Sequence, residues 1–130
     1  MQLNDIHAHA ADQDKGKWFD LVDPVEGRPT GIRLLMAGPD SATQRRAELA
    51  LVDELAMLAD GDGRVSAENR EKARLNCLAR CVLGWEIEEG GEPVPFTHGN
   101  VLRLLTSARW VREAVDGFAG DRAAFGGFHD

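Results

Sequence analysis

The sequence lacks the long apolar runs of membrane proteins and secreted precursors. Its 130 residues include no stretch near the roughly 18 apolar residues that a membrane span needs. Residues 1–17 also lack the basic start and the apolar run of a signal peptide. We therefore expect a soluble protein that acts in the cytoplasm and does not bind a membrane.

Positive charge is scarce as well. The 15 Lys and Arg residues are outnumbered by 22 Asp and Glu residues, which leaves a formal net charge of −7. Nucleic acids and anionic membrane surfaces attract clustered basic side chains, so direct binding to nucleic acid is not expected. A basic or neutral protein partner fits this charge better.

Cysteine is limited to Cys77 and Cys81. Their spacing places both on one face of a predicted helix, where an internal disulfide would strain the helix geometry. We interpret them as buried apolar residues in a reducing compartment. A metal site with His7 and His9 is the alternative, but no second closely spaced cysteine pair supports it. We expect neither a bound metal nor a cofactor.

The sequence motifs of common enzymes are missing. There is no GxSxG, GxxxxGK, HExxH or paired CxxC pattern, so we do not expect an enzyme. Residues 60–66 partly match a calcium-binding loop around Gly63, but Leu58 and Asn69 fall at the first and twelfth positions, where oxygen ligands are needed. We predict a turn between two helices there, with Ser66 capping the second helix.

Two apolar segments in the first third of the chain predict a β-hairpin. Residues 18–22 and 31–37 are rich in apolar and β-branched side chains, and a loop containing glycine and proline separates them. A Gly-Pro pair ends the second segment. Asp40 or Ser41 can then cap a helix with a side-chain oxygen. This hairpin is the predicted organising element of the fold.

Helical patterns dominate the rest of the chain. Residues 41–59 predict an amphipathic helix lying on the hairpin, and residues 67–83 predict a second helix. Residues 85–96, with four acidic side chains and a Gly-Gly turn, predict a short hairpin or a pair of extended arms. Thr97 can cap a final long helix, and the sequence there contains a heptad seam formed by Val101, Leu104, Leu105, Ala108, Val111, Val115 and Phe118.

These patterns together predict an α+β fold. An N-terminal β-hairpin packs on about three α-helices, and a second short hairpin or extended segment precedes the last long helix. We expect residues 1–16 to form a flexible lead, residues 17–119 a single domain, and residues 120–130 a flexible tail. The heptad seam most often indicates packing within the domain, but it leaves a homo-oligomer open.

Three aromatic residues near the C-terminus are the candidate partner-binding residues. Trp110 lies off the heptad seam, whereas Phe118 and Phe125 lie at its end and in the predicted tail. Aromatic side chains concentrate binding energy at protein interfaces. We predict that Trp110, Phe118 and Phe125 contact a partner, although the tail could also fold back on its own domain.

The order of these signals resembles the small tail assembly chaperone-like proteins of siphophages and prophages. The resemblance spans about residues 18–125 and rests on the tryptophan-led hairpin, Gly38-Pro39-Asp40-Ser41, Gly84-Trp85, the acidic glycine turn, and Pro95-Phe96-Thr97 with Asn100. It implies a non-virion helper that coats the tape measure protein, keeps it soluble and recruits tail-tube subunits. It assigns no binding residue.

Two other classes of function stay open. A phage-encoded inhibitor could use its acidic loops to occupy the nucleic-acid-binding groove of a host protein, and its binding would then depend strongly on salt. A permanent tail or capsid accessory subunit would instead remain in purified particles.

Overall fold

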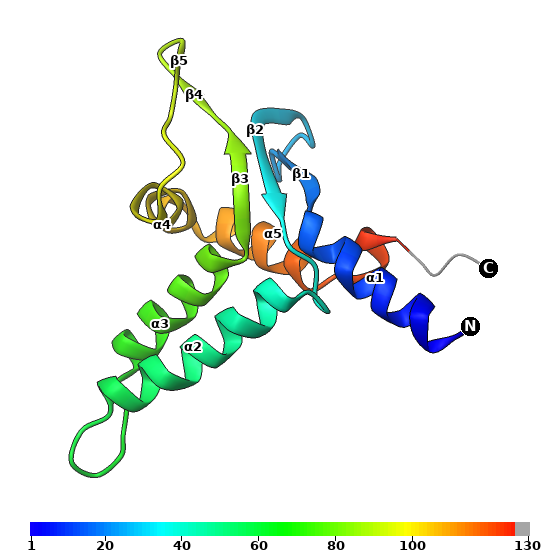
Figure 1. Cartoon of the computed structure of the whole chain (residues 1–130). Helices are drawn as coiled ribbons and strands as arrows, with labels where there is room; N and C mark the ends of the chain where they lie inside the picture. The colour runs from blue at the N-terminus through cyan, green and yellow to red at the C-terminus, as the bar shows by residue number, and fades with distance from the viewer. Residues whose placement is uncertain (127–130) are drawn as a thin grey trace.

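A computed structural model describes residues 1–126 of the chain and shows an α+β fold (Figure 1). A three-stranded antiparallel sheet has the strand order β1-β2-β3, and a separate two-stranded ribbon is formed by β4 and β5. The elements in chain order are α1 (Leu3–Lys15), β1 (Lys17–Val22), β2 (Pro29–Met36), α2 (Ala42–Leu58), α3 (Ala67–Arg80), β3 (Val82–Glu86), β4 (Glu88–Glu89), β5 (Glu92–Pro93), α4 (His98–Ser107), α5 (Arg109–Ala119) and the 3-10 helix η1 (Arg122–Phe125).

The predicted hairpin is confirmed and forms two thirds of the main sheet. Its register pairs Phe19 with Leu34, and Leu34 pairs in turn with Trp85 of β3. The core combines one face of this sheet with α3, α4 and α5, and its largest fully buried apolar side chains are Leu21, Leu34, Met36, Val101, Leu105 and Val115. The second hairpin is also confirmed, because Gly90 and Gly91 adopt positive φ angles between β4 and β5.

The predicted helix caps are confirmed as well. The hydroxyl oxygens of Ser41, Ser66 and Thr97 accept hydrogen bonds from the backbone amides three residues later. Each hydroxyl satisfies one of the amide groups that the first helical turn leaves without a partner. Residues 59–66 therefore form the predicted turn between α2 and α3.

The arrangement of α2 differs from the prediction. The helix lies along α3, and the pair extends away from the sheet as a helical hairpin (Figure 1). Only Gln44 and Ala47, both near the start of α2, are buried. The sequence period identified the helix but could not identify the element against which it packs.

Two boundaries in the second half of the chain also differ. The helix predicted over residues 67–83 ends at Arg80, because Val82 to Glu86 join the sheet as β3. The predicted last helix is broken at Ala108, which has an extended conformation with φ −160° and ψ 148°. The hydroxyl groups of Thr106 and Ser107 donate to carbonyl oxygens of the preceding turn, so they end α4 without glycine or proline.

Both ends of the described chain contain helical segments that the sequence did not predict. Residues 1–16, predicted to be a flexible lead, contain α1, whose first turn carries a capping box between Gln2 and Asp5. Residues 120–126, predicted to belong to a flexible tail, contain η1 with Asp121 as its cap. The remaining predicted tail, residues 127–130, lies outside the described residues. Hydrogen bonds to the segment between β2 and α2 connect both ends to the domain.

Candidate functional site

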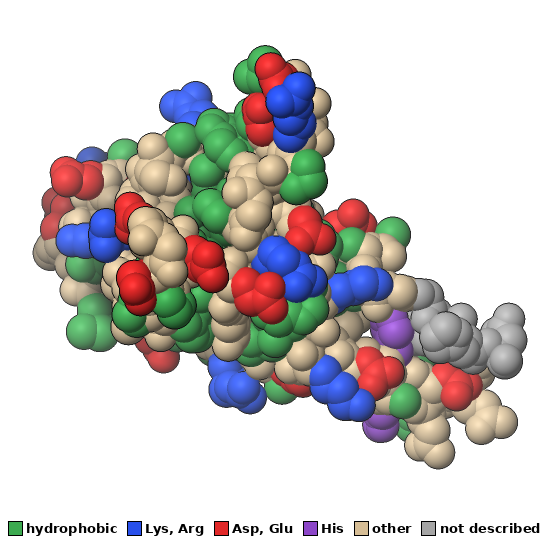
Figure 2. All heavy atoms as spheres, turned by 90° about the horizontal axis from the view of Figure 1, so that it is seen from above, with side chains coloured by type: hydrophobic (Ala, Val, Ile, Leu, Met, Phe, Trp, Pro, Cys, Tyr) green, Lys and Arg blue, Asp and Glu red, His purple; other side chains and the backbone are tan. Residues whose placement is uncertain are grey.

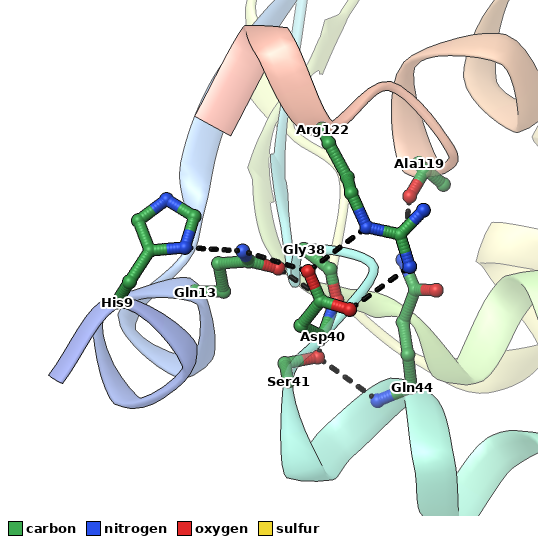
Figure 3. A network of polar contacts seen from close by, with 8 residues as sticks. All are labelled: His9, Gln13, Gly38, Asp40, Ser41, Gln44, Ala119 and Arg122. Atoms are coloured by element: carbon green, nitrogen blue, oxygen red, sulfur yellow. Dashed lines mark hydrogen bonds and ion pairs between the residues drawn. The ribbon is translucent and has the colours of Figure 1, made fainter. Parts of the chain in front are cut away.

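A cluster of polar contacts surrounds the junction between β2 and α2 (Figure 3). Gln13 of α1 is 2% exposed, and its side-chain oxygen accepts a hydrogen bond of 2.7 Å from the amide of Asp40. The amide of Gly38 donates to the backbone oxygen of Gln13 at 3.1 Å. A Cβ atom on Gly38 would lie only 2.4 Å from the side-chain oxygen of Gln13, so glycine allows this close approach.

Two further side chains connect this junction to other elements: Gln44 reaches the end of α5, and Asp14 belongs to α1. The side-chain Nε2 of Gln44 donates to the carbonyl oxygens of Ala37 at 2.9 Å and Ala119 at 2.7 Å. The carboxylate of Asp14 accepts from the backbone amides of Ala42 and Thr43 at the start of α2. Burial alone would raise the pKa of Asp14, but these hydrogen bonds outweigh it and lower the pKa below its ordinary value.

Asp40 connects the same junction to η1. Its carboxylate oxygens accept from Nε and Nη2 of Arg122 at 3.0 and 2.9 Å. This contact lowers the pKa of Asp40 and raises the pKa of Arg122. The Nε2 atom of His9 also lies 2.9 Å from the carbonyl oxygen of Gly126. These groups find their partners within the chain, which indicates a structural role in joining α1, α2 and the C-terminal segment.

The three predicted partner-binding residues all lie half-buried against the core. The ring of Phe118 stacks on Phe19 of β1 with centroids 4.7 Å apart, and Phe125 lies 5.1 Å from Phe118. Trp110 lies two helical turns earlier on α5. The structure therefore brings Phe118 and Phe125 together, and their contact with a partner stays a prediction.

The two thiols line an open pocket between α2, α3 and α5. Cys77 is half-buried and Cys81 is buried, and both are free. Burial raises the pKa of Cys77, and it raises that of Cys81 to about 12. Because the protonated thiol is a poor nucleophile, these shifts disfavour nucleophilic attack by either thiol at neutral pH. Within residues 1–126, no group of three or more His, Cys, Asp or Glu side chains could hold a metal ion.

An open groove separates the end of the main sheet from the β4–β5 ribbon. The β2–β3 register ends at the pair of Arg33 and Glu86, so no residue of β3 pairs with residues 29–32 of β2. The chain after β3 is held apart from β2 by its own contacts. The indole Nε1 of Trp85 donates to the carbonyl oxygen of Val94 at 2.9 Å. The backbone amide of Val94 donates to the carbonyl oxygen of Ile87 at 2.8 Å.

This groove combines an apolar floor with an acidic side. Its volume is about 570 Å³, and its apolar lining residues are Ile32, Trp85, Ile87, Pro93 and Val94. Glu86 and Glu88 also line it, and Glu89 and Glu92 lie beyond on the ribbon. Figure 2 views this face from above and shows acidic side chains gathered over the β4–β5 ribbon beside apolar surface.

A second unusual surface lies on the outer side of α2. Leu49 and Val52 are 52% and 64% exposed, and Ala56 is exposed as well. These three residues form the α2 stripe. Their spacing of three and then four residues places them on one face of the helix, away from Leu51 and Glu54, which face α3. Large apolar side chains that are exposed together in this way mark interaction surfaces.

Neither surface was identified from the sequence. The spacing of the α2 stripe is present in the sequence, but Leu51, Leu55 and Leu58 form a competing apolar face on the same helix. The groove depends on the pairing of β3 with β2, which the sequence did not predict. Both surfaces follow from tertiary packing.

Comparisons with protein-family models, with characterised proteins and with solved structures find no match to this chain. Among the described residues, no helix has both the length and the apolar character needed to cross a membrane. Functional inference therefore rests on the surfaces described above.

Proposed function

We propose that this protein is a non-catalytic helper of phage tail assembly, similar to the tail assembly chaperones of siphophages. It would bind the helical tape measure protein in the host cytoplasm, keep it dispersed, and bring tail-tube subunits to it. The observation that carries this proposal is the α2 stripe, an apolar helical surface that no other element of the described chain covers.

The geometry of the stripe suits a helical partner. Leu49, Val52 and Ala56 have the spacing with which one helix contacts another in a coiled coil. The α2–α3 hairpin extends away from the sheet, so the outer side of α2 beyond its first turns is open to a helix lying along it (Figure 1). The net charge of −7 would help to keep such a complex dispersed.

The C-terminal aromatic residues are less accessible than the α2 stripe. Phe118 and Phe125 pack on each other and on the core, so they hold η1 against the domain. This packing leaves the α2 stripe as the more accessible apolar surface. Contact of Trp110, Phe118 and Phe125 with a partner remains part of the proposal.

Co-expression with the tape measure protein of the same phage or prophage tests the proposal. We expect the native chain to increase the soluble fraction of the tape measure protein. The double substitution Leu49→Gln and Val52→Gln should abolish this increase, because it removes the apolar contact and keeps good helix formers. Quantitative gel analysis of soluble and insoluble fractions provides the measurement.

Val25 offers a matched control. It is 88% exposed in the loop between β1 and β2, so Val25→Gln makes the same chemical change away from the stripe. This control should retain full activity. A native chain that leaves the solubility of the tape measure protein unchanged would refute the function, and a fully active double variant would refute the role of α2.

A further inference from the structure

We propose that the groove between β2 and the β4–β5 ribbon binds an extended peptide segment of a partner protein, in which apolar and basic residues alternate. The segment would add a strand beside residues 29–32 of β2. This binding mode is independent of the α2 stripe, because the two surfaces lie on different elements and suit different conformations of the bound chain.

The open edge of β2 is the first support. Residues 29–32 continue beyond the last residue that pairs with β3, and on that side no strand of residues 1–126 covers them. Exposed strand edges offer backbone groups to an incoming strand. Pro29 has no amide hydrogen and the amide of Ile32 already donates to Oγ1 of Thr30 at 3.2 Å, so this edge would bind mainly through its carbonyl oxygens. Gly31 adopts a φ of +86° and has no atom within 4 Å of the position that a Cβ would occupy, so the groove is open above its backbone.

The size of the groove fits a short segment. Residues 29–32 span about 13 Å at ~3.3 Å per residue, which matches the central part of a short bound strand. The volume of about 570 Å³ would hold a few side chains of such a segment. The β4–β5 ribbon forms the opposite wall, and the contact of Trp85 with Val94 fixes its position.

The chemistry of the walls defines the bound residues. Side chains of a strand alternate between two faces, so one set can meet the apolar floor while the other set meets the acidic side. Glu86 is already paired with Arg33 at 3.0 Å. Glu88, Glu89 and Glu92 are exposed, and the ion pairs found within residues 1–126 do not include them. These three carboxylates favour Lys or Arg in the segment.

Selection from a library of random ten-residue peptides, displayed against the full-length protein, tests this inference. We expect enrichment of sequences in which Lys or Arg alternates with apolar residues. In ¹H–¹⁵N spectra, a synthetic copy of the most enriched peptide should shift the amide signals of Gly31, Ile32 and Ile87, and leave those of Leu49 and Val52 unchanged.

Matched variants define the contribution of charge. The substitutions Glu88→Gln and Glu92→Gln together should weaken peptide binding by ~2- to 10-fold, since exposed ion pairs contribute modestly. Glu113→Gln makes the same change at an exposed position of α5 and should leave binding unchanged.

Three results would overturn the inference. The selection could fail to enrich alternating basic and apolar residues, the shifts could lie outside the groove, or the double variant could bind as tightly as Glu113→Gln. None of these results bears on the co-expression test of the α2 stripe, so failure of one proposal is distinguishable from failure of the other.

Discussion

Two regions of the molecule differ in whether their side chains find partners within the chain. One is the junction at residues 38–41, and the other is the outer surface of α2. At the junction, Gln13 and Gln44 are buried, and each forms hydrogen bonds to segments distant in the sequence. On the outer face of α2, Leu49 and Val52 are apolar and remain exposed. A buried polar group must find partners to offset its lost hydration, whereas an exposed apolar group gains by finding a partner elsewhere.

This difference separates scaffold from binding surface. The junction joins α1, α2 and η1, so the two ends of the domain are held at one place (Figure 3). The α2–α3 hairpin and the β4–β5 ribbon extend from the domain on the other side (Figure 1). Substitutions at the junction should therefore change the stability of the fold, and substitutions on the extended elements should change binding.

The largest effect is expected at Gln44. Replacing it by Leu keeps a similar volume but removes the amide that donates to the carbonyl oxygens of Ala37 and Ala119. Each buried carbonyl left without a donor costs about 1–3 kcal/mol. We expect Gln44→Leu to lower the free energy of unfolding by about 2–4 kcal/mol, measured by urea denaturation followed by circular dichroism.

Asp53 provides the control for this comparison. It is exposed on the same helix, so Asp53→Leu introduces the same side chain without removing a buried hydrogen bond. Its effect should stay within about 0.5 kcal/mol. Equal stability of the two variants would show that the junction does not depend on the amide of Gln44.

A smaller effect that depends on pH is expected at Asp40. Its pKa in the folded state is lowered, chiefly by the hydrogen bonds from Arg122, so the ionised carboxylate stabilises the fold. This contribution is fully present above the pKa of about 3.9 in the unfolded chain, and it is lost as the pH falls through the lower folded value. Asp40→Asn should cost about 1 kcal/mol at neutral pH and progressively less below about pH 4.

Urea denaturation of the native chain and of Asp40→Asn, at neutral pH and below about pH 4, measures how the cost of the substitution depends on pH. Arg122→Gln removes the other partner of the pair and should reproduce the pH dependence, and the double variant should add little to either single change. A cost of Asp40→Asn that is the same at neutral and acidic pH would show that the pair does not stabilise the fold through its charge.

Local sequence signals predicted the parts of the fold that local physics controls. Turn formers between apolar segments identified both hairpins, and Ser41, Ser66 and Thr97 marked helix starts because one hydroxyl satisfies a nearby amide. The period of residues 42–58 identified α2. These features depend on residues that are close together in the chain.

The features that the sequence did not predict depend on distant partners. Val82 and Trp85 continue the helical spacing of α3, yet they join β3 because an edge of β2 is available to them. Residues 1–16 carry few apolar side chains, so α1 is stabilised by polar contacts from Gln13 and Asp14 to residues 38–43. The groove and the α2 stripe share this origin, since both are surfaces left open by the way the elements pack.

The smallest effect on stability is expected from the α2 stripe, where the largest effect on partner binding is proposed. Leu49→Gln with Val52→Gln should change the free energy of unfolding by less than about 0.5 kcal/mol, because both side chains already meet water and Gln favours a helix. Leu51→Gln is the informative contrast. Leu51 is half-buried beside Cys77 and Leu78, so its replacement should cost about 1–2 kcal/mol in the same urea denaturation. If the double variant were as costly as Leu51→Gln, the stripe would contribute to the fold of the free chain, and its exposure would no longer argue for a partner.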